Sequence, residues 1–458
     1  MPVQIHAAAR RGDLAELRWC FARGAAADAR DGAGNTPLLA TLESLRAFDR
    51  RSKPHATPET VQALLDAGAD PNAVGERGLT PIHLAVQTGE VALVERLERA
   101  GADVQHRTAG GYTTLLHACY QPPGKGKLAI LQKLISAGID ANAASDYGES
   151  PLSVCLYFGD FAALRLLVKA GSEPARLGWS EPMARFALAG DQEPAAWEAV
   201  RAIPEQSKTA WRLTPLLLAT KQGSLAKLDW LLAQGADVHA SAHCGQTALH
   251  LAAEHDHLKV VDRLLELGLA TDTRNEFEET SLMHACEWDA PRVVARLLGA
   301  GASVEAEDHV QSRAIHRASS LPVWRLLVER GGADLNVVSG DGRWPLQVAA
   351  ERNDLEAARW LVAAGAKVAL TGTGATALHA AIQSDAREVA AFLLGQGADP
   401  NAPDVDGWTP LFCARSRQAI ALLLAQGADP TVRDQAGGWA VDRMQDPVLR
   451  EALTGGRP

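Results

Sequence analysis

The chain has 458 residues, of which 47% are hydrophobic and 22% charged, a composition typical of globular proteins that excludes a disordered, collagen-like or fibrous chain. Its 45 basic and 55 acidic residues give a formal net charge of −10. That sign disfavours binding to the phosphates of nucleic acid or to anionic lipid.

The six cysteines are more than thirty residues apart and form no C-x-x-C motif, so the sequence predicts neither a zinc ribbon nor a dense disulfide scaffold. No apolar run is long enough to span a bilayer, and the N-terminus lacks a charged start followed by an apolar segment. We therefore expect a protein of a reducing compartment, the cytosol, that does not enter a membrane.

One marker recurs at a nearly constant interval along the chain. A glycine flanked by small residues, often followed by Ala-Asp, occurs twelve times, and the commonest spacing is 33 residues. The two longest intervals, 44 and 64 residues, indicate one unit with extra residues and nearly two units with one marker lost. A period of this length is typical of an array of small supersecondary units.

Each unit is predicted to contain two helices. Thr80 before Pro81 indicates a helix start, because the threonine hydroxyl can cap free amides and proline at the first position has no N–H to leave unpaired. The run 91–97 spaces its large residues by three and four, which predicts a second helix with one buried face. Gly101 ends that helix, and 102–111 reads as a hairpin-like loop to the next unit.

The helix-start segments 80–85, 247–253 and 376–381 resemble the ankyrin repeat, whose signature is T-P-L-H-x-A at a period of 33 residues. The resemblance covers about thirteen units plus a terminal cap. It implies an all-α ankyrin-repeat solenoid, in which helix-turn-helix units joined by β-hairpin-like loops share one continuous core. It also implies that the histidine of the signature bonds to backbone between repeats, which here concerns His6, His83, His250, His316 and His379.

In chain order, we expect N-terminal repeats over 1–178, a degenerate repeat over 179–210, C-terminal repeats over 211–434 and a cap over 435–458. The first part carries a basic insertion near 45–57 and a smaller one at 121–127. Residues 179–210 keep the length of a unit but lose both markers. They form either a repeat that still packs or a hinge between two sub-arrays.

The resemblance implies that partners are bound by the loop tips and by the exposed ends of the first helices. Aromatic residues are frequent at these sites, and Trp and Tyr often dominate interface energies. They are either covered by a partner or packed against neighbouring loops. The aromatic candidates are Tyr112, Tyr120, Tyr147, Tyr157, Phe158, Trp211, Phe277, Trp288 and Trp408.

Residues 243–308 contain thirteen acids and five bases, and so carry most of the net charge. This run indicates either a solvated acidic face or a docking patch for a basic protein surface. In a later unit, residues of the opposite sign could orient the partner. The charged and polar candidates are Glu254, His255, Glu276, Glu279, Glu287, Arg343 and Arg352.

We expect no metal, cofactor or catalytic residue. By residue type His255 and His257 could bind zinc, but their spacing on a turn gives poor geometry. Cys119, Cys155 and Cys286 fall near the ends of first helices, where a small hydrophobic side chain packs between neighbours.

The sequence thus predicts a non-catalytic scaffold, monomeric when free, that binds another protein on its concave face. Two narrower functions remain open. One is an immunity-type stoichiometric inhibitor of a toxic enzyme, and the other is a secreted effector that binds host proteins.

Overall fold

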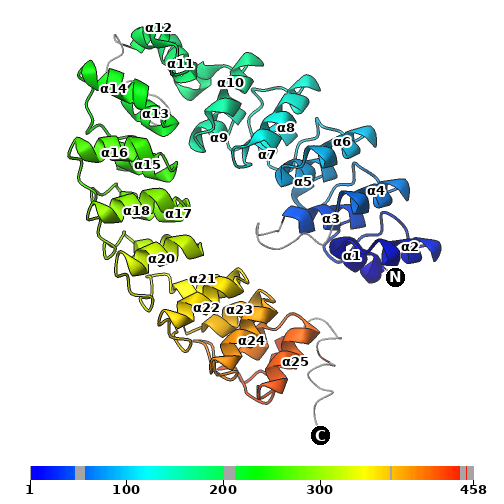
Figure 1. Cartoon of the computed structure of the whole chain (residues 1–458). Coiled ribbons are helices and arrows are strands. Elements are labelled where there is room, and N and C mark those ends of the chain that lie inside the picture. Colours follow the sequence, from blue (N-terminus) through cyan, green and yellow to red (C-terminus); the bar gives the residue numbers. More distant parts are fainter. Residues whose placement is uncertain (1, 47–56, 201–211, 372–373, 444–449, 451–458) are drawn as a thin grey trace. The chain divides into compact units, whose positions relative to one another are not determined.

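A computed structural model describes residues 2–46, 57–200, 212–371, 374–443 and 450 of the chain. The described residues form pairs of short helices stacked in chain order (Figure 1), and their loops pair only through four isolated β-bridges. The chain divides into two compact units, Met1–Ile203 (unit 1) and Pro204–Pro458 (unit 2). Trp211 and most of the basic insertion near 45–57 lie outside the described residues.

In unit 1 the two helices of each repeat pack on each other, and from α1 to α9 each first helix also packs on the next. The first helices are α1 (Pro2–Arg11), α3 (Pro37–Arg46), α5 (Pro81–Thr88), α7 (Thr114–Cys119), α9 (Pro151–Tyr157) and α11 (Glu181–Leu188). The second helices are α2 (Leu14–Ala22), α4 (Pro58–Asp66), α6 (Val91–Arg99), α8 (Lys125–Ser136), α10 (Phe161–Lys169) and α12 (Pro194–Trp197). Short 3₁₀ turns are η1 (Glu76–Gly78), η2 (Pro174–Leu177) and η3 (Glu198–Val200).

Unit 2 repeats this plan. Its first helices are α13 (Pro215–Gln222), α15 (Ala248–Glu254), α17 (Ser281–Glu287), α19 (Ala314–Arg317), α21 (Pro345–Glu351), α23 (Ala377–Gln383), the 3₁₀ turn η5 (Pro410–Cys413) and α26 (Ala440–Arg443). Its second helices are α14 (Leu225–Ala233), α16 (Leu258–Glu266), α18 (Pro291–Gly299), α20 (Leu321–Glu329), α22 (Leu355–Ala363), α24 (Arg387–Gly395) and α25 (Arg417–Ala425). One loop contains the turn η4 (His243–Gly245). The described residues thus hold thirteen pairs followed by α26.

The signature threonine and histidine together begin the first helices. In α15, Thr247 is the N-cap, and its side chain accepts a hydrogen bond from the backbone of the first turn. His250 completes the capping box, because its Nδ1 accepts the Thr247 N–H at 3.3 Å. The same arrangement starts α5 and α23.

The marker glycines end the second helices through their backbone conformation. All twelve have positive φ, for example 89° at Gly101. A Cβ on Gly101 would meet no atom within 4 Å, so crowding does not select glycine there. The left-handed backbone conformation selects glycine instead, because it strains any residue that has a Cβ.

The core of each unit lies between the helix pairs. Val260, Val261 and Leu264 of α16 are at most 1% exposed, as the spacing of three and four predicts for a helix with one buried face. The same spacing buries Leu93, Val94 and Leu97 in the run 91–97. One repeat alone could not cover these faces, so the stack is the smallest stable structure.

The described part of the degenerate segment also packs as a helix pair. Pro182 and Pro194 lie in the first turns of α11 and α12, where they start the helices. Trp179, Phe186 and Trp197 are at most 5% exposed and fill this pair. The division between units 1 and 2 follows at Ile203–Pro204. The domain boundaries at 178, 210 and 434 remain predictions.

The smaller insertion is only partly a loop. Residues 121–124 connect the helices, whereas Lys125 begins α8. Lys127 is 3% exposed, and its Nζ lies 2.9 Å from the Asp160 carboxylate and 2.7 Å from the Cys119 carbonyl oxygen. This lysine therefore ties α8 to the next repeat.

Candidate functional site

The loop tips between repeats and the C-terminal ends of the first helices form a surface that we call the finger face of each unit. Nine large hydrophobic residues are exposed in the described part of the chain, and two of them, Trp19 and Leu267, belong to second helices or their caps. The other seven lie on the finger face. They are Val74, Tyr120, Tyr147, Tyr157, Phe277, Val310 and Val405.

All four tyrosines of the chain gather on the finger face of unit 1. The ring centroid of Tyr112 lies 6.5 Å from that of Tyr120 and 6.2 Å from that of Tyr147. Phe158 continues the group, 6.1 Å from Tyr120 and 5.1 Å from Tyr157. We call these five residues the tyrosine cluster. Residues far apart in a sequence with only 5% aromatics thus form one aromatic surface.

One carboxylate holds two rings of the tyrosine cluster. The Tyr112 hydroxyl donates to Glu149 Oε2 at 2.5 Å, and the Tyr120 hydroxyl donates to Glu149 Oε1 at 2.8 Å. The hydrogen bond to Glu149 raises the pKa of Tyr112, while burial and then Glu149 raise that of Tyr120. Both phenols therefore remain protonated donors at neutral pH.

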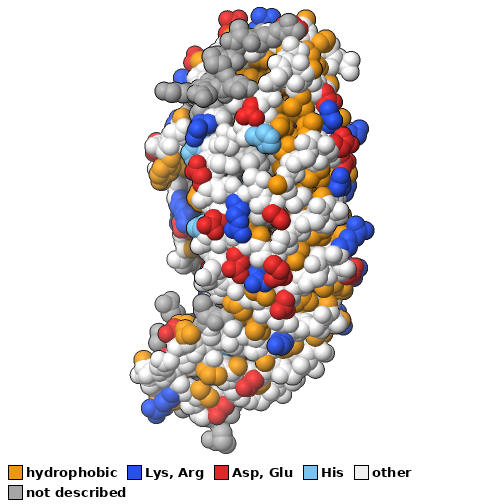
Figure 2. Space-filling view, turned by 90° about the vertical axis from the view of Figure 1, so that its left-hand side faces the viewer, with side chains coloured by type: hydrophobic (Ala, Val, Ile, Leu, Met, Phe, Trp, Pro, Cys, Tyr) orange, Lys and Arg blue, Asp and Glu red, His pale blue; other side chains and the backbone are white. Residues whose placement is uncertain are grey.

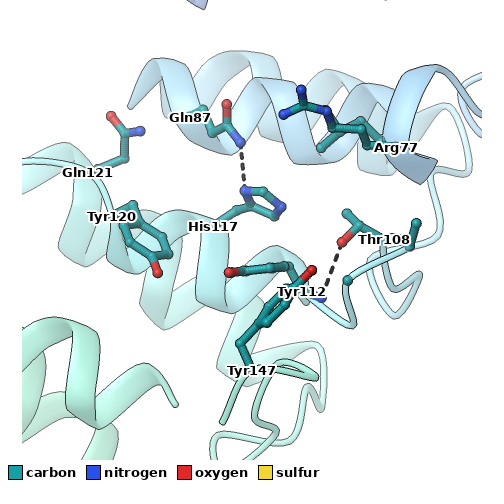
Figure 3. Close-up of a pocket in the computed structure, with 11 residues that line it drawn as sticks. Arg77, Gln87, Thr108, Tyr112, His117, Tyr120, Gln121 and Tyr147 are labelled. Carbon is teal, nitrogen blue, oxygen red and sulfur yellow. Dashed lines mark hydrogen bonds between the residues drawn. The ribbon is translucent and has the colours of Figure 1, made fainter. Parts of the chain in front are cut away.

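A groove of about 780 Å³ opens beside these rings. Figure 3 shows Tyr112 and Tyr147 on one side, with Gln87 and Gln121 at the helix ends opposite them. His117 lies between these groups, and its Nδ1 is 2.6 Å from the Gln87 amide nitrogen. The further lining residues are Arg77, Leu79, Thr108, Ala109, Gly110 and Tyr120.

In unit 2 the exposed apolar side chains occupy neighbouring loop tips. Phe277 is 43% exposed and lies 5.5 Å from the His309 ring, and Val310 follows directly. The His309 N–H donates to the Phe277 carbonyl oxygen at 3.1 Å, which links the two tips. Trp288, at the end of α17, is partly exposed, and its ring lies 6.2 Å from that of His255.

Some of the predicted contact residues are covered by other side chains of the protein. Glu254 is 7% exposed, and its carboxylate lies 3.7 Å from Lys221 Nζ, so little of it is accessible, and its role in partner binding stays a prediction. His255 is also mostly covered, with Nε2 2.7 Å from Lys221 Nζ. The side chain of Glu279 is 15% exposed and bonds to His284 and Arg317. Of the four predicted acids, Glu276 alone is exposed without an ion pair to another described residue.

Two arginines just beyond the acidic run form ion pairs with five of its acids. Arg317 bonds to the carboxylates of Glu279, Glu287 and Asp308 at 2.6 to 3.1 Å. Arg313 pairs with Glu305 and Glu307. The run is therefore part of a mixed-charge network, and it presents less negative charge than its composition indicates.

Ion pairs also join successive second helices in unit 2. Arg263 of α16 lies 2.8 Å from Asp229 of α14, and Arg296 of α18 lies 2.5 Å from Asp262 of α16. Figure 2, which views the side of Figure 1 where α14, α16 and α18 lie, shows acidic and basic side chains interleaved. This face carries no large area of one sign.

The remaining predicted residues lie farther along unit 2. Arg343 and Arg352 are exposed and bond to Glu351 and to the Ser319 carbonyl oxygen. Trp408 is partly exposed and stacks on Phe412 with centroids 6.2 Å apart. No contact described here links Arg343, Arg352 or Trp408 to Phe277, His309 or Val310.

The sequence models for ankyrin repeats match most of the chain. The model described as "Ankyrin repeats (3 copies)" matches residues 52–145, 206–308 and 313–404, and "Ankyrin repeat" matches 406–435. The chain belongs to the ankyrin repeat family. This confirms the predicted family and the all-α ankyrin fold, and the family indicates a protein–protein interaction scaffold.

Relatives share segments of this ankyrin array. The chain is 32% identical to human ankyrin repeat and SOCS box protein 16 over 177 residues, which are 37% of this chain and 36% of that protein. It is 28% identical to the putative ankyrin repeat protein YahD of Escherichia coli over 180 residues, 38% of this chain and 82% of YahD. It is 27% identical to dog inversin over 240 residues, 50% of this chain but only 21% of inversin.

Solved ankyrin structures align with parts of the chain. The ankyrin repeat domain of Bcl-3 covers 46% of this chain and 98% of its own length, with 31% identity and a TM-score of 0.40. A domain from Acinetobacter baumannii covers 40% of this chain and 98% of its own, with 35% identity and a TM-score of 0.36. No helix in the described ranges has the length and apolarity needed to cross a bilayer.

The ankyrin signature histidines link successive repeats. Their Nε2 atoms lie 2.8 to 3.0 Å from a carbonyl oxygen of the following loop, in the pairs His6–Asn35, His250–Glu279, His316–Val337 and His379–Trp408. This geometry matches the bonding that the resemblance implies for these four histidines, whereas the buried Nε2 of His83 makes no such bond among the described residues. Among the described residues no group of three or more His, Cys, Asp or Glu side chains could hold a metal ion.

The buried cysteines have the environment of packing residues. Burial raises the pKa of the Cys286 thiol, and the neighbouring Cys155 thiol and burial raise that of Cys119. Thiols kept protonated are poor nucleophiles.

The sequence analysis missed several residues of the finger face. They include Glu149, which lies in another repeat than the acidic run, and Arg317, which lies just outside that run. Alignment of the repeats marks Glu149, because it occupies the position of Tyr112 one repeat later. No comparable signal marks Val310 or Val405, since valine is usually a buried residue and the sequence does not show that these two are exposed.

Proposed function

We propose that this ankyrin protein is a non-catalytic scaffold that binds another protein on its finger face, which is the concave face in our prediction. One observation carries the proposal. Seven of the nine exposed large hydrophobic residues in the described ranges lie on that face.

The physical argument rests on the cost of leaving apolar surface in water. Single exposed hydrophobic residues are common, but grouped ones mark interaction sites. Phe277 and Val310 lie on adjacent loop tips, and Tyr120, Tyr147 and Tyr157 lie in one cluster. The second helices of unit 2 instead pair their charges with one another, as in Asp229–Arg263. The finger face thus carries most of the exposed large hydrophobic side chains of the described residues.

A matched pair of variants tests this proposal once a partner has been captured with the full chain and identified. Phe277 and Trp19 are 43% and 44% exposed, but only Phe277 lies on the finger face. We expect Phe277→Ala to weaken partner binding by about 2 kcal/mol, a roughly thirtyfold higher Kd, because a buried aromatic anchor is lost. Isothermal calorimetry measures both variants.

Trp19→Ala is the control and should leave the Kd unchanged. Equal losses in the two variants, or no loss in either, would contradict binding on the finger face. Circular dichroism of each variant separates lost binding from lost folding.

The acidic run does not favour the narrower function of an inhibitor that plugs a basic cleft. Arg313 and Arg317 form ion pairs with five of its acids, and Glu254 is buried. That function and the effector alternative remain predictions from the sequence.

A further inference from the structure

We propose that the tyrosine cluster of unit 1 binds an arginine side chain of the partner protein. This inference rests on the proposed scaffold function and names the chemistry that one part of the finger face recognises. It follows from three features of the described residues: aromatic faces, a carboxylate without a counter-charge, and a groove kept open by a glycine.

The aromatic faces attract a cation. Tyr112, Tyr120 and Tyr147 all line the groove, and Tyr147 is 77% exposed. A cation is attracted to the negative face of an aromatic ring, and the planar guanidinium of arginine can also stack on it. A neutral apolar side chain would gain burial here but not this electrostatic attraction.

Glu149 supplies the negative charge. Its carboxylate is partly exposed, accepts two phenol hydrogen bonds and forms no ion pair with any described residue. Glu149 does not line the groove itself, so it acts through Tyr112 and Tyr120, whose hydroxyls it holds. Its negative charge attracts a cation that stacks on these rings.

The other charges near the groove do not cancel this one. Arg77 lines the mouth, but its side chain is 85% exposed and its Nε lies 3.7 Å from Glu76. Arg107 donates to the Ala144 carbonyl oxygen and lies beside Asp146, as the environment of Gly111 shows. These two arginines are balanced by two acids, which leaves Glu149 in excess.

Gly110 keeps the space between the rings open. A Cβ at this position would lie 3.2 Å from ring carbons of both Tyr112 and Tyr147. Any larger residue would push the two rings apart or fill the gap. The groove, at about 780 Å³, can take an arginine side chain with some flanking backbone.

The test uses the fact that this chain has only four tyrosines and all belong to the cluster. Full-length protein labelled with 3-fluorotyrosine gives four fluorine NMR signals, each assigned by a single Tyr→Phe variant. N-acetylarginine amide is titrated as the probe, and N-acetylcitrulline amide, which has nearly the same shape but no charge, is the control ligand.

We expect saturable shifts of the Tyr112, Tyr120 and Tyr147 signals with the arginine amide and none with the citrulline amide. Glu149→Gln should raise the Kd of the arginine amide by about fivefold or more, because the attraction of the carboxylate is lost. Glu90→Gln, at an exposed acid outside the groove, should leave it unchanged. Gly110→Ala should weaken the shifts while the helical circular dichroism persists.

Equal shifts with the citrulline amide, no shifts at all, or tighter binding of N-acetyllysine amide would overturn the arginine site. If the arginine titration fails in one of these ways but Phe277→Ala still weakens partner binding, only the arginine site is wrong and the scaffold function is retained. Saturable arginine binding in a protein whose partner binding is unchanged by both Phe277→Ala and Glu149→Gln overturns the proposed finger-face function instead.

Discussion

At the scale of single residues, neighbouring acids on one loop have opposite environments. Glu276 is exposed, whereas Glu279, three positions later, accepts hydrogen bonds from His284, Asn275 and Arg317. The hydrogen bond from His284 is the main reason that the pKa of Glu279 falls from 4.5 to about 2. Glu279 therefore contributes to stability, and Glu276 remains available to solvent or a partner.

The first prediction concerns Glu279→Gln. Because the carboxylate has a lower pKa in the folded state, its contribution is present above the unfolded pKa of 4.5 and is lost as the pH falls towards 2. We expect the variant to be less stable by about 1 to 2 kcal/mol at neutral pH, after allowance for solvent screening, and the deficit to vanish near the folded pKa. Urea denaturation at several pH values measures it.

Glu276→Gln is the matched control on the same loop and should not change stability. A deficit in Glu279→Gln that persists at the lowest pH would mean that packing, and not charge, holds this residue.

At the scale of elements, four of the signature histidines join a first helix to the next loop. His250 Nδ1 accepts from Thr247, so Nε2 carries the proton and donates to the Glu279 carbonyl oxygen at 3.0 Å. The bond to Nδ1 requires the neutral ring, because a protonated ring has no acceptor nitrogen. Burial lowers the pKa of His250 to about 4. The links between repeats are therefore sensitive to acid.

We accordingly predict that α15 loses stability below neutral pH. His250 binds a proton in the unfolded state at 6.5 but in the folded state only near 4, so protonation opposes folding between these values. The expected loss at α15 across this range is roughly 2 kcal/mol. Hydrogen exchange of the α15 amides measures local opening in an array that does not unfold in one step.

In His250→Gln the pH dependence of α15 should shrink by that amount, although the variant starts from lower stability. A variant whose α15 amides keep the full pH dependence would assign the effect to other groups.

At the scale of the whole molecule, each of the two units is a stack in which each repeat contacts mainly its neighbours. Within each unit the helix pairs pack in sequence, and their apolar faces form a continuous core. Stability in such an array is a sum of repeat and interface contributions, so several adjacent repeats suffice to fold. The division at Ile203–Pro204 leaves complete helix pairs on both sides.

We predict that residues 1–203 and 204–458 fold as separate fragments. The far-ultraviolet circular dichroism of the two, added in equal molar amounts, should match that of the intact chain, because helix pairing is local. A fragment that is helical only when mixed with the other would show that the units depend on each other.

Much of the fold could be predicted from the sequence because its causes are local. The threonine at each helix start, the glycine at each helix end and the spacing of apolar residues act within one or two turns, and α5 and α6 contain all three. The candidate site was predicted less well. The tyrosine positions came from the repeat register, but Glu149 joins two of them through contacts 29 and 37 residues apart.

By itself, then, the sequence determined the repeat, its two helices and the loops on which contact residues lie, since these depend on the order of neighbouring residues. Only the tertiary structure decided which side chains are available. Glu254 turns inward to Lys221, and Arg317 forms ion pairs with three acids, Glu279, Glu287 and Asp308. The free energy of a charge or an aromatic ring depends on what lies beside it in space, and stacking brings residues of different repeats together.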